Sequence, residues 1–499
     1  MSLDFWLPLM IVMSSLVPGI VIFCLPEERT GWRTTANMAG ATAKLLLTAV
    51  MIWGVFHGHV YETRLPLLPG MDLVLSADAL SVLFATLSAI LWFLTTLYAI
   101  AYLEASPQSR SRFFGFFSLC VSSTVGFSLA GNLITFVMFY EMLTLSTYPL
   151  VVHRGTEESM RAGRIYLSYT LTGGAVLLFA AAWLKALVGP IDFTQGGMLA
   201  AFSGLYRHEF TVIFALLISG LGVKAALVPL HGWLPVAMVA PAPVSALLHA
   251  VAVVKAGAFG IVRVVYDIYG IEFAAKLGLL GPLAAVASFT IVYGSLRALN
   301  QDGLKKRLAY STVSQVSYIA LGAAVLGPVA TIGGLVHLVH QGLMKITLFF
   351  CAGNLAETLG IHYVSEMHGV GRRMPWTMAA FTLGALGMIG VPPLAGFISK
   401  WYLGAGGLAA GQNWVILVLA ASSLLNAAYF LPILYIAWFE QPKGPWPEEH
   451  YRGWLETHWM LLLPAVITAL LALSAGLLAN APFSPLGWAR LIALREYGP

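Results

Sequence analysis

The sequence predicts an all-α polytopic membrane protein, and two observations carry that prediction. First, 59% of the 499 residues are hydrophobic and only 10% are charged, with a mean hydropathy of +0.82. A soluble protein of this length could not hide that much apolar surface, so the surrounding solvent must be lipid. Second, the apolar residues form long runs, with no strand-type alternation and no large polar domain. Only helices then fit, because a backbone in lipid must satisfy its own hydrogen bonds.

The long apolar runs predict about fourteen transmembrane helices. Each run has roughly 18–25 residues, the length that crosses about 30 Å of hydrocarbon. The runs fall near residues 5–24, 38–58, 79–104, 113–130, 133–152, 165–187, 210–230, 243–267, 275–296, 308–326, 329–352, 376–400, 414–438 and 460–479.

Loop charges predict the orientation of these helices. Basic residues collect in alternate loops, for example at Arg110, Arg154, Lys305 and Arg372. Loops rich in Lys and Arg usually face the cytoplasm. We therefore expect a multi-pass protein of the bacterial inner membrane with both termini on the outer face.

Glu141 is an ionisable side chain inside a predicted membrane helix, and its presence there needs an explanation. It lies near the middle of the apolar run 133–152, within the stretch FVMFYEMLTLSTY. A charge at the centre of a membrane helix costs about 2.5–3.5 kcal/mol or more, and such residues commonly mark ion or proton paths. The simpler alternative is that Glu141 and one lysine form a static buried ion pair.

Five lysines also lie inside the apolar runs, namely Lys44, Lys224, Lys255, Lys345 and Lys400. A nearby carboxylate favours the protonated form of a lysine. We therefore expect Glu141 to hold Lys224 protonated when it is close, and to release that proton when it moves away. The remaining charges would then act in turn as a switched relay.

Two of these lysines lie beside proline interruptions. Pro229 follows Lys224 by five residues, and Pro392 and Pro393 precede Lys400. Proline removes a backbone donor and breaks a helix interior. The sequence therefore predicts an interrupted helix near each lysine, one in each half of the chain. Paired broken helices of this kind indicate an inverted-repeat transporter.

The segment GGLVHLVHQGLMKITLFFCAG adds His337, His340, Gln341 and Lys345 to the predicted path. His337, Gln341 and Lys345 share one helical face, and His340 neighbours His337. Histidine titrates near neutral pH and can relay protons. Metal binding is the weaker reading, because no carboxylate or cysteine accompanies the pair.

Four further ionisable residues need separate consideration. His231 and His249 lie near Lys224 and Lys255 in sequence and are accessory candidates. Asp78 precedes the third helix, so it either caps that helix or belongs to the path. Lys44 is expected near a helix end, where its ammonium can snorkel to the interface, and we leave it outside the path.

Several other classes of function are disfavoured by the sequence. The three cysteines, Cys24, Cys120 and Cys351, lie in separate runs, and no motif for a disulfide framework, haem or zinc is present. No nucleotide-binding motif occurs.

The net charge of +5 is explained by basic cytoplasmic loops rather than by binding to nucleic acid. We therefore expect no cofactor and no bound metal. The N-terminus lacks the features of a cleaved signal peptide, so the first helix is expected to be retained.

Over about residues 70–440 the chain resembles the antiporter-like membrane subunits of respiratory complex I and of Mrp cation/proton antiporters. The resemblance rests on several long motifs in the same order. They are SADALSVLF, FVMFYEMLTLSTYPLV, GVKAALVPLHGWLPVAMVAPAPVSALLHAVAVVKAGAFGIVRV, DGLKKRLAYSTVSQVSYI, HLVHQGLMKITLFFCAG and GVPPLAGFISKW.

This resemblance implies a domain organisation. Residues 1–112 would form helices 1–3, residues 113–267 the first inverted repeat of five helices, and residues 275–438 the second. Residues 439–499 would form a cytoplasmic loop and helix 14. Length and motifs are most similar to the Mrp D-type protein.

The resemblance also implies roles for the buried residues. Glu141 and Lys224 would form a coupling pair, and Lys255 would be the central relay lysine. His337, His340 and Lys345 would lead towards Lys400, which is a lysine here although one antiporter-like subunit of complex I has glutamate.

The expected function is a proton-translocating subunit of a multisubunit cation (Na+)/H+ antiporter, working with other membrane subunits in the lipid bilayer. It is a transporter subunit rather than a catalyst. The alternatives are a proton-pumping subunit in the membrane arm of a redox complex, of the NADH-quinone oxidoreductase or hydrogenase type, an energising subunit for bicarbonate uptake, and a membrane scaffold. Lysines and histidines suit protons better than sodium, and no oxygen-rich sodium site stands out. Any sodium path would therefore lie partly in another subunit.

Overall fold

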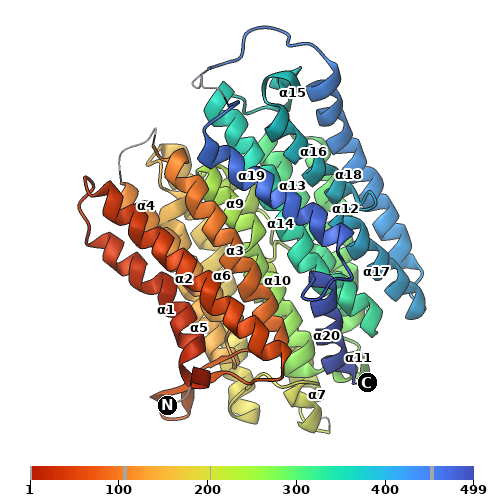
Figure 1. Cartoon of the computed structure of the whole chain (residues 1–499). Helices are drawn as coiled ribbons and strands as arrows, with labels where there is room; N and C mark the ends of the chain where they lie inside the picture. Colours follow the sequence, from red (N-terminus) through yellow and green to blue (C-terminus); the bar gives the residue numbers. More distant parts are fainter. Residues whose placement is uncertain (1–2, 105–108, 203, 450–454, 499) are drawn as a thin grey trace.

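The computed structural model describes residues 3–104, 109–202, 204–449 and 455–498, and it confirms the all-α polytopic class. Helices cover most of these residues and pack side by side in one elongated bundle (Figure 1). The helix α1 begins and α20 ends at the same end of this bundle (Figure 1). The location of both termini on the outer face of the membrane stays a prediction.

The chain begins with three long helices and one β-hairpin. The helices are α1 (Leu3–Phe23), α2 (Thr30–Phe56) and α3 (Ala79–Tyr102), with strands β1 (Glu62–Leu68) and β2 (Met71–Ser76) between the last two.

The next helices are α4 (Arg110–Ser128), α5 (Leu133–Val151), α6 (Glu157–Val188), α7 (Arg207–Lys224), α8 (Trp233–Val236), α9 (Ala242–Ala250) and α10 (Val253–Arg263). A π-helix (Val264–Tyr269) and α11 (Ile271–Lys276) follow. Short 3-10 helices lie at Met198–Phe202, Ala237–Val239 and Val364–Glu366.

The remaining helices are α12 (Leu280–Leu299), α13 (Leu304–Ala324), α14 (Pro328–Leu359), α15 (Val370–Arg373), α16 (Pro375–Ile389), α17 (Ala395–Ala409), α18 (Trp414–Phe439), α19 (Trp459–Leu477) and α20 (Pro485–Tyr497).

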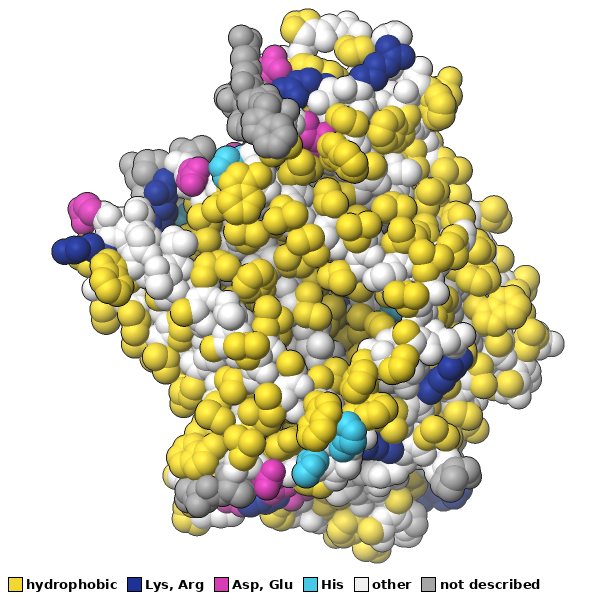
Figure 2. All heavy atoms as spheres, viewed as in Figure 1, with side chains coloured by type: hydrophobic (Ala, Val, Ile, Leu, Met, Phe, Trp, Pro, Cys, Tyr) yellow, Lys and Arg dark blue, Asp and Glu magenta, His cyan; other side chains and the backbone are white. Residues whose placement is uncertain are grey.

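Every apolar run expected from the sequence coincides with a helix or with a pair of helices. Among the described residues, ten helical spans are long and apolar enough to cross a membrane. Four runs lie outside this set. The helix α4 is rich in polar residues, α13 carries Lys305, Lys306 and Arg307 in its first turn, and breaks shorten α7 and separate α16 from α17. The count of fourteen crossings therefore stays a prediction. Hydrophobic side chains cover the middle of the visible face, and most charged ones lie towards its two ends (Figure 2).

The hairpin β1–β2 is a feature that the sequence analysis missed, because it expected helices alone. Its strands pair antiparallel, and Gly70 at the turn has φ +73°. The Pro-Gly pair before β2 is a typical turn signal, but the strands are short and lie outside the apolar runs.

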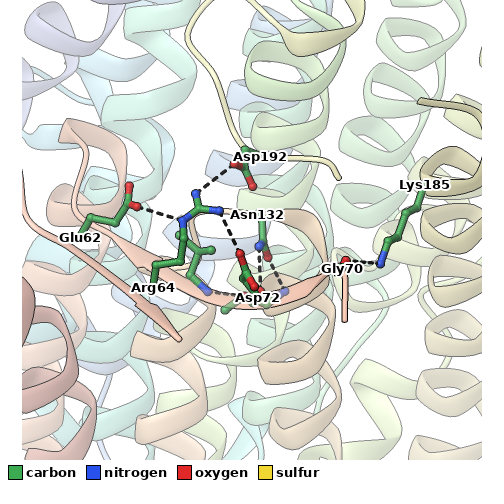
Figure 3. Close-up of polar contacts among 9 residues, drawn as sticks. Glu62, Arg64, Gly70, Asp72, Asn132, Lys185 and Asp192 are labelled. Atoms are coloured by element: carbon green, nitrogen blue, oxygen red, sulfur yellow. Dashed lines mark hydrogen bonds and ion pairs between the residues drawn. The ribbon is translucent and has the colours of Figure 1, made fainter. Parts of the chain in front are cut away.

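Polar contacts fix this hairpin to the neighbouring helices (Figure 3). The Arg64 side chain donates to Glu62 at 3.2 Å, Asp72 at 3.4 Å and Asp192 at 3.0 Å. Lys185 of α6 donates to the Gly70 carbonyl at 2.7 Å (Figure 3). Asn132 caps α5 and donates to the Asp72 carbonyl at 2.9 Å. The hairpin therefore links the ends of α5 and α6.

Two interrupted helices occur where the sequence predicts them, and a third one does not follow from the sequence. The helix α7 ends at Lys224, before Pro229, and Pro392 and Pro393 separate α16 from α17. The third break, at Val251 and Ala252, separates α9 from α10. Neither proline nor glycine marks this point, so no sequence signal could have located it.

The helix α14 forms the centre of the bundle. It packs against α9, α13, α16, α17, α19 and α20, and its apolar window is completely buried. The broken span α9–α10 is equally buried. Gly342 of α14 lies against the break, because a Cβ at this position would be 2.9 Å from the Ala250 carbonyl oxygen. The two most buried spans of the protein thus meet at the α9–α10 break.

A glycine-to-alanine change should test the close packing of α10 on the end of α7. A Cβ on Gly257 would overlap the Ala225 nitrogen and lie 2.5 Å from the Leu221 oxygen, and backbone atoms cannot move aside cheaply. We expect Gly257→Ala to destabilise the protein by about 1–3 kcal/mol, as overpacking does. The thermal unfolding midpoint in detergent measures this change.

Gly281 provides the matched control. It is an exposed glycine of α12, and a Cβ there would meet nothing within 4 Å. Gly281→Ala should leave the midpoint unchanged or raise it, because alanine is the better helix former. An equal loss of stability in both variants would contradict the packing argument.

Candidate functional site

Glu141 lies in the middle of α5, facing α6. Its side chain is half-buried, and its Oε1 atom is buried without a hydrogen-bond partner. Gly174 of α6 lies directly opposite, and a Cβ there would overlap the carboxylate. Glycine at this position therefore makes room for the carboxylate between the two helices.

Lys224 is the last residue of α7 and is fully buried. Its ammonium donates a hydrogen bond to the Tyr140 carbonyl and lies 3.3 Å from the centroid of the Tyr140 ring. Both residues are described by the structure, yet no ion pair joins Lys224 to Glu141, the neighbour of Tyr140. The alternative of a static ion pair between Glu141 and Lys224 is therefore not what this structure contains.

Lys255 connects the first half of the chain to α14. It lies in the first turn of α10, directly after the α9–α10 break, and is fully buried. Its Nζ donates to the Leu338 carbonyl of α14 at 2.9 Å. The residue before Leu338 is His337, so Lys255 lies against the histidine segment of α14.

The buried side chains of α14 contact different neighbouring helices. His340 Nδ1 is 2.9 Å from the Ser399 hydroxyl of α17. The His337 ring lies 5.0 Å from the Tyr318 ring of α13. Lys345 donates to the Ser311 hydroxyl of α13 at 2.6 Å and to the Leu308 carbonyl at 3.1 Å.

Lys400 lies in α17 and reaches back to the end of α16. Its Nζ donates to the Met388 carbonyl at 3.1 Å, to the Ile389 carbonyl at 2.7 Å and to the Ser423 hydroxyl at 2.8 Å. It also lies 5.8 Å from the Tyr318 ring, the ring that neighbours His337. Lys400 is thus adjacent to the histidine segment through Tyr318 and through its own neighbour Ser399.

The accessory residues lie at different places. His249 is fully buried and stacks on Phe349 of α14, with ring centroids 4.5 Å apart. The His231 ring lies 5.2 Å from the Tyr293 ring. Asp78 is the N-cap of α3, as one of the two readings expected, and its carboxylate accepts from the Ser81 nitrogen at 2.7 Å.

The prediction that Lys44 snorkels is wrong. Lys44 lies in the middle of α2 and is fully buried. Its Nζ donates to the Ser15 hydroxyl at 2.6 Å and lies 4.8 Å from the Trp92 ring. The helix α2 begins earlier than the apolar run suggested, which moves Lys44 away from the helix end.

Sequence reasoning missed the neutral partners that hold the charged groups. Tyr140, Tyr318, Ser311 and Ser399 are ordinary residues of membrane helices, and nothing in their spacing marks them. In the sequence Arg263 lies at a helix edge, yet in the structure it is 2% exposed. Only the three-dimensional packing identifies these side chains.

Arg263 is the centre of a second cluster, at the bundle end where α20 finishes. Its guanidinium donates to Asp78 at 2.5 Å and to Asp267 at 2.8 Å. Glu496 of α20 lies near these carboxylates. Burial, together with repulsion from Asp267 and Asp78, raises the pKa of Glu496 from 4.5 to about 8.

The geometry of the main site defines a class of protein. The protein is a helical membrane bundle in which a row of buried lysines and histidines lies between two broken helices. One carboxylate, that of Glu141, lies at the first of these lysines. Such a row can hold and pass protons. These features are typical of membrane proteins that conduct ions or protons.

The comparisons with known proteins agree with this class. The profile described as NADH:quinone oxidoreductase/Mrp antiporter, TM, matches residues 130–426. NADH-quinone oxidoreductase subunit N of Desulforudis audaxviator is 35% identical, covering 82% of this chain and 82% of that protein. The D subunit of the Na(+)/H(+) antiporter of Bacillus subtilis is 30% identical, covering 81% and 80%. The chain therefore belongs to the NADH:quinone oxidoreductase/Mrp antiporter family.

Solved structures show the same fold. A chain of the Mrp complex from Dietzia sp. DQ12-45-1b superposes with a TM-score of 0.87 at 24% identity, covering 100% of this chain and 98% of that one. A chain of an archaeal membrane-bound sulfane sulfur reductase superposes with a TM-score of 0.85 at 22% identity, covering 98% and 97%.

The raised pKa of Glu496 predicts a pH-dependent effect on stability. The folded protein keeps this carboxyl protonated to higher pH than the unfolded chain does, so wild-type stability falls as pH rises from about 4.5 to about 8. A glutamine cannot ionise. The unfolding midpoint of Glu496→Gln should therefore exceed that of wild type by a margin that grows over this range and then stays constant.

The control for this experiment is Glu272→Gln in α11, where the glutamate side chain is 84% exposed. It should show no growing difference from wild type. A margin for Glu496→Gln that is independent of pH would rule out the titration of Glu496 as the cause.

Proposed function

We propose that this chain is the proton-translocating subunit of a multisubunit cation (Na+)/H+ antiporter. The observation that carries the proposal is the series of buried ionisable groups between the two proline-broken helices. It begins at Glu141 and Lys224, crosses between the two halves where Lys255 binds the α14 backbone, and ends at Lys400. A membrane protein retains buried charges at such cost where they serve transport.

Buried polar atoms without protein partners support a hydrated path along this series. They include both ring nitrogens of His249 and His337 and both amide atoms of Gln315 and Gln341. Buried polar groups of this kind are normally satisfied by internal water. Water molecules between histidines and lysines would let protons move between groups that do not touch.

The proposed roles follow the order of the groups. Glu141 controls the charge of Lys224, and Gly174 leaves the carboxylate room to approach or withdraw. Lys255 receives the proton at the crossing between the halves. His337, His340 and Lys345 lead it towards Lys400, while His231 and His249 serve as accessory groups and Asp78 stays outside this row.

The proposed partners are other membrane subunits of a larger assembly. One relative is named as the D component of a Na(+)/H(+) antiporter. The ions transported here are proposed to be H+ and Na+, in a bacterial inner membrane with both termini outside. The division into two inverted repeats, residues 113–267 and 275–438, belongs to the same proposal.

A redox-linked proton pump is the second candidate. The 35% identity to an NADH-quinone oxidoreductase subunit N supports it. Hydrogenase-4 component B of Escherichia coli, at 32% identity, supports it as well, although the chain covers only 63% of that protein. In this case the same relay would be driven by electron transfer in a partner. Energising bicarbonate uptake would also use the same relay.

Cation-driven proton flux in everted vesicles tests the proposal, with the native complex at matched assembly. Glu141→Gln should lower the flux by about tenfold or more, as loss of a proton-transfer group does. Lys224→Ala, Lys255→Ala and Lys400→Ala should act in the same direction. Flux that requires electron transfer rather than a sodium gradient would favour the redox-linked pump.

Lys44→Met is the matched control, because Lys44 is a fully buried lysine outside the series. It should keep the wild-type flux per assembled complex. Wild-type flux in Glu141→Gln as well would make Glu141 a structural residue and would remove the basis of the proposed relay.

A further inference from the structure

A hydrogen-bonded network of neutral side chains extends from Lys345 to α13 and α18. Lys345 donates to the Ser311 hydroxyl at 2.6 Å. The Tyr429 hydroxyl of α18 lies 2.9 Å from the Ser311 Oγ atom and 2.7 Å from the Asn426 Oδ1 atom. All four side chains are at most 1% exposed.

The same network reaches Lys400 from the other direction. The Asn426 amide donates to the Met388 carbonyl at 3.0 Å. Lys400 donates to that same carbonyl oxygen at 3.1 Å. Two donors therefore share one acceptor, and this acceptor lies at the end of α16, next to the break before Lys400.

We propose that Ser311, Tyr429 and Asn426 form a bridge that makes protonation of Lys345 and protonation of Lys400 oppose each other. This inference rests on the proposed function, in which both lysines carry protons in turn. The bridge residues are positioning residues, since they act through the two lysines.

The proton count of the bridge gives it two arrangements. Tyr429 has one hydroxyl proton but two acceptors, the oxygens of Ser311 and Asn426, and Ser311 likewise has one proton. When Lys345 is an ammonium it must donate to Ser311. The positive charge beside Ser311 makes the serine oxygen a poorer acceptor for the tyrosine, so Tyr429 donates its single proton to Asn426 instead.

When Lys345 is a neutral amine, the Tyr429 hydroxyl proton turns from Asn426 to Ser311. Its nitrogen then accepts the Ser311 proton, Ser311 accepts from Tyr429, and Asn426 loses the tyrosine donor. The charge of Lys345 thus decides whether the Tyr429 hydroxyl donates to Asn426. No proton crosses the amide of Asn426, because an amide and a backbone carbonyl are poor proton carriers.

The coupling has a definite sign. An amide whose oxygen accepts a hydrogen bond becomes a stronger donor through its nitrogen, because bonds in a chain polarise one another. Protonated Lys345 therefore strengthens the bond from Asn426 to the Met388 oxygen. This leaves a weaker acceptor for the Lys400 ammonium, so loading a proton on Lys345 favours its release from Lys400.

Other titratable and charged groups around the bridge do not provide this link. Arg307 of α13 donates to the Tyr429 carbonyl at 3.1 Å and contacts the backbone rather than the hydroxyl. Tyr318 of α13 lies beside Lys400 and His337. The Ser295 hydroxyl, at 3.4 Å from Asn426 Oδ1, is the remaining donor to this amide oxygen among the described residues.

The test removes the one hydroxyl and keeps the ring. Tyr429→Phe, in the native complex in everted vesicles, should lower sodium-driven proton flux by about tenfold, a size typical of coupled residues in one network. Ser311→Ala breaks the same bridge from α13 and should act alike, and it carries the test if Tyr429→Phe does not assemble. Tyr269→Phe is the control, because Tyr269 is also fully buried and its hydroxyl donates to a backbone carbonyl, that of Phe210, away from the two lysines.

Infrared difference spectra between alkaline and acid samples supply a readout that needs no transport. With ring-labelled tyrosine, the wild type should show a shifted tyrosine C–O band. This band should disappear in Tyr429→Phe and in Lys345→Ala and persist in Tyr269→Phe. A merely structural tyrosine would not respond to the removal of Lys345.

The outcomes distinguish a failure of the bridge from a failure of the proposed function. Wild-type flux in both bridge variants, or a tyrosine band that survives in Lys345→Ala, overturns the bridge. Absence of sodium-driven flux in the wild type would defeat the antiporter proposal instead, and the infrared band would still decide whether the bridge exists.

Discussion

The need to hold ammonium groups inside an apolar bundle shapes the rest of this structure. The buried lysines are bound by neutral oxygens rather than by carboxylates. Lys224 binds the Tyr140 carbonyl, Lys255 the Leu338 carbonyl and Lys44 the Ser15 hydroxyl. A carbonyl or hydroxyl dipole solvates an ammonium without cancelling its charge. Each of these lysines can therefore still lose its proton.

Helix breaks supply part of the oxygen atoms that this requires. The last carbonyls of a helix have no partner within it. Lys400 uses this directly, since it binds the Met388 and Ile389 carbonyls where α16 ends. The two lysines beside proline breaks differ in one respect: Lys224 has a carboxylate, Glu141, on the adjacent helix, whereas Lys400 has hydroxyls and carbonyls around it.

The sequence was sufficient for the helices and the two proline breaks. Apolar run length and proline chemistry act locally, so they can be read without a structure. The break between α9 and α10 could not be predicted, because neither proline nor glycine marks it in the sequence, although Gly342 of the distant α14 packs against it in the structure. Helical spacing placed His337 and Lys345 on one face but could not show that they contact different residues of α13. The burial of Lys44 depends on Ser15 of another helix, which spacing within α2 cannot reveal.

The glycine opposite Glu141 has a consequence for how the protein sits among its neighbours. The helix α6 lies at the edge of the bundle, with Leu171 and Leu178 about half exposed. Gly174 of the same helix lies against the Glu141 carboxylate with no side chain of its own between them. Low-dielectric material screens a charge weakly. A charged group on a protein that packs against α6 would therefore change the electrostatic potential at Glu141. This effect requires no channel through the bundle and no ion that crosses the contact.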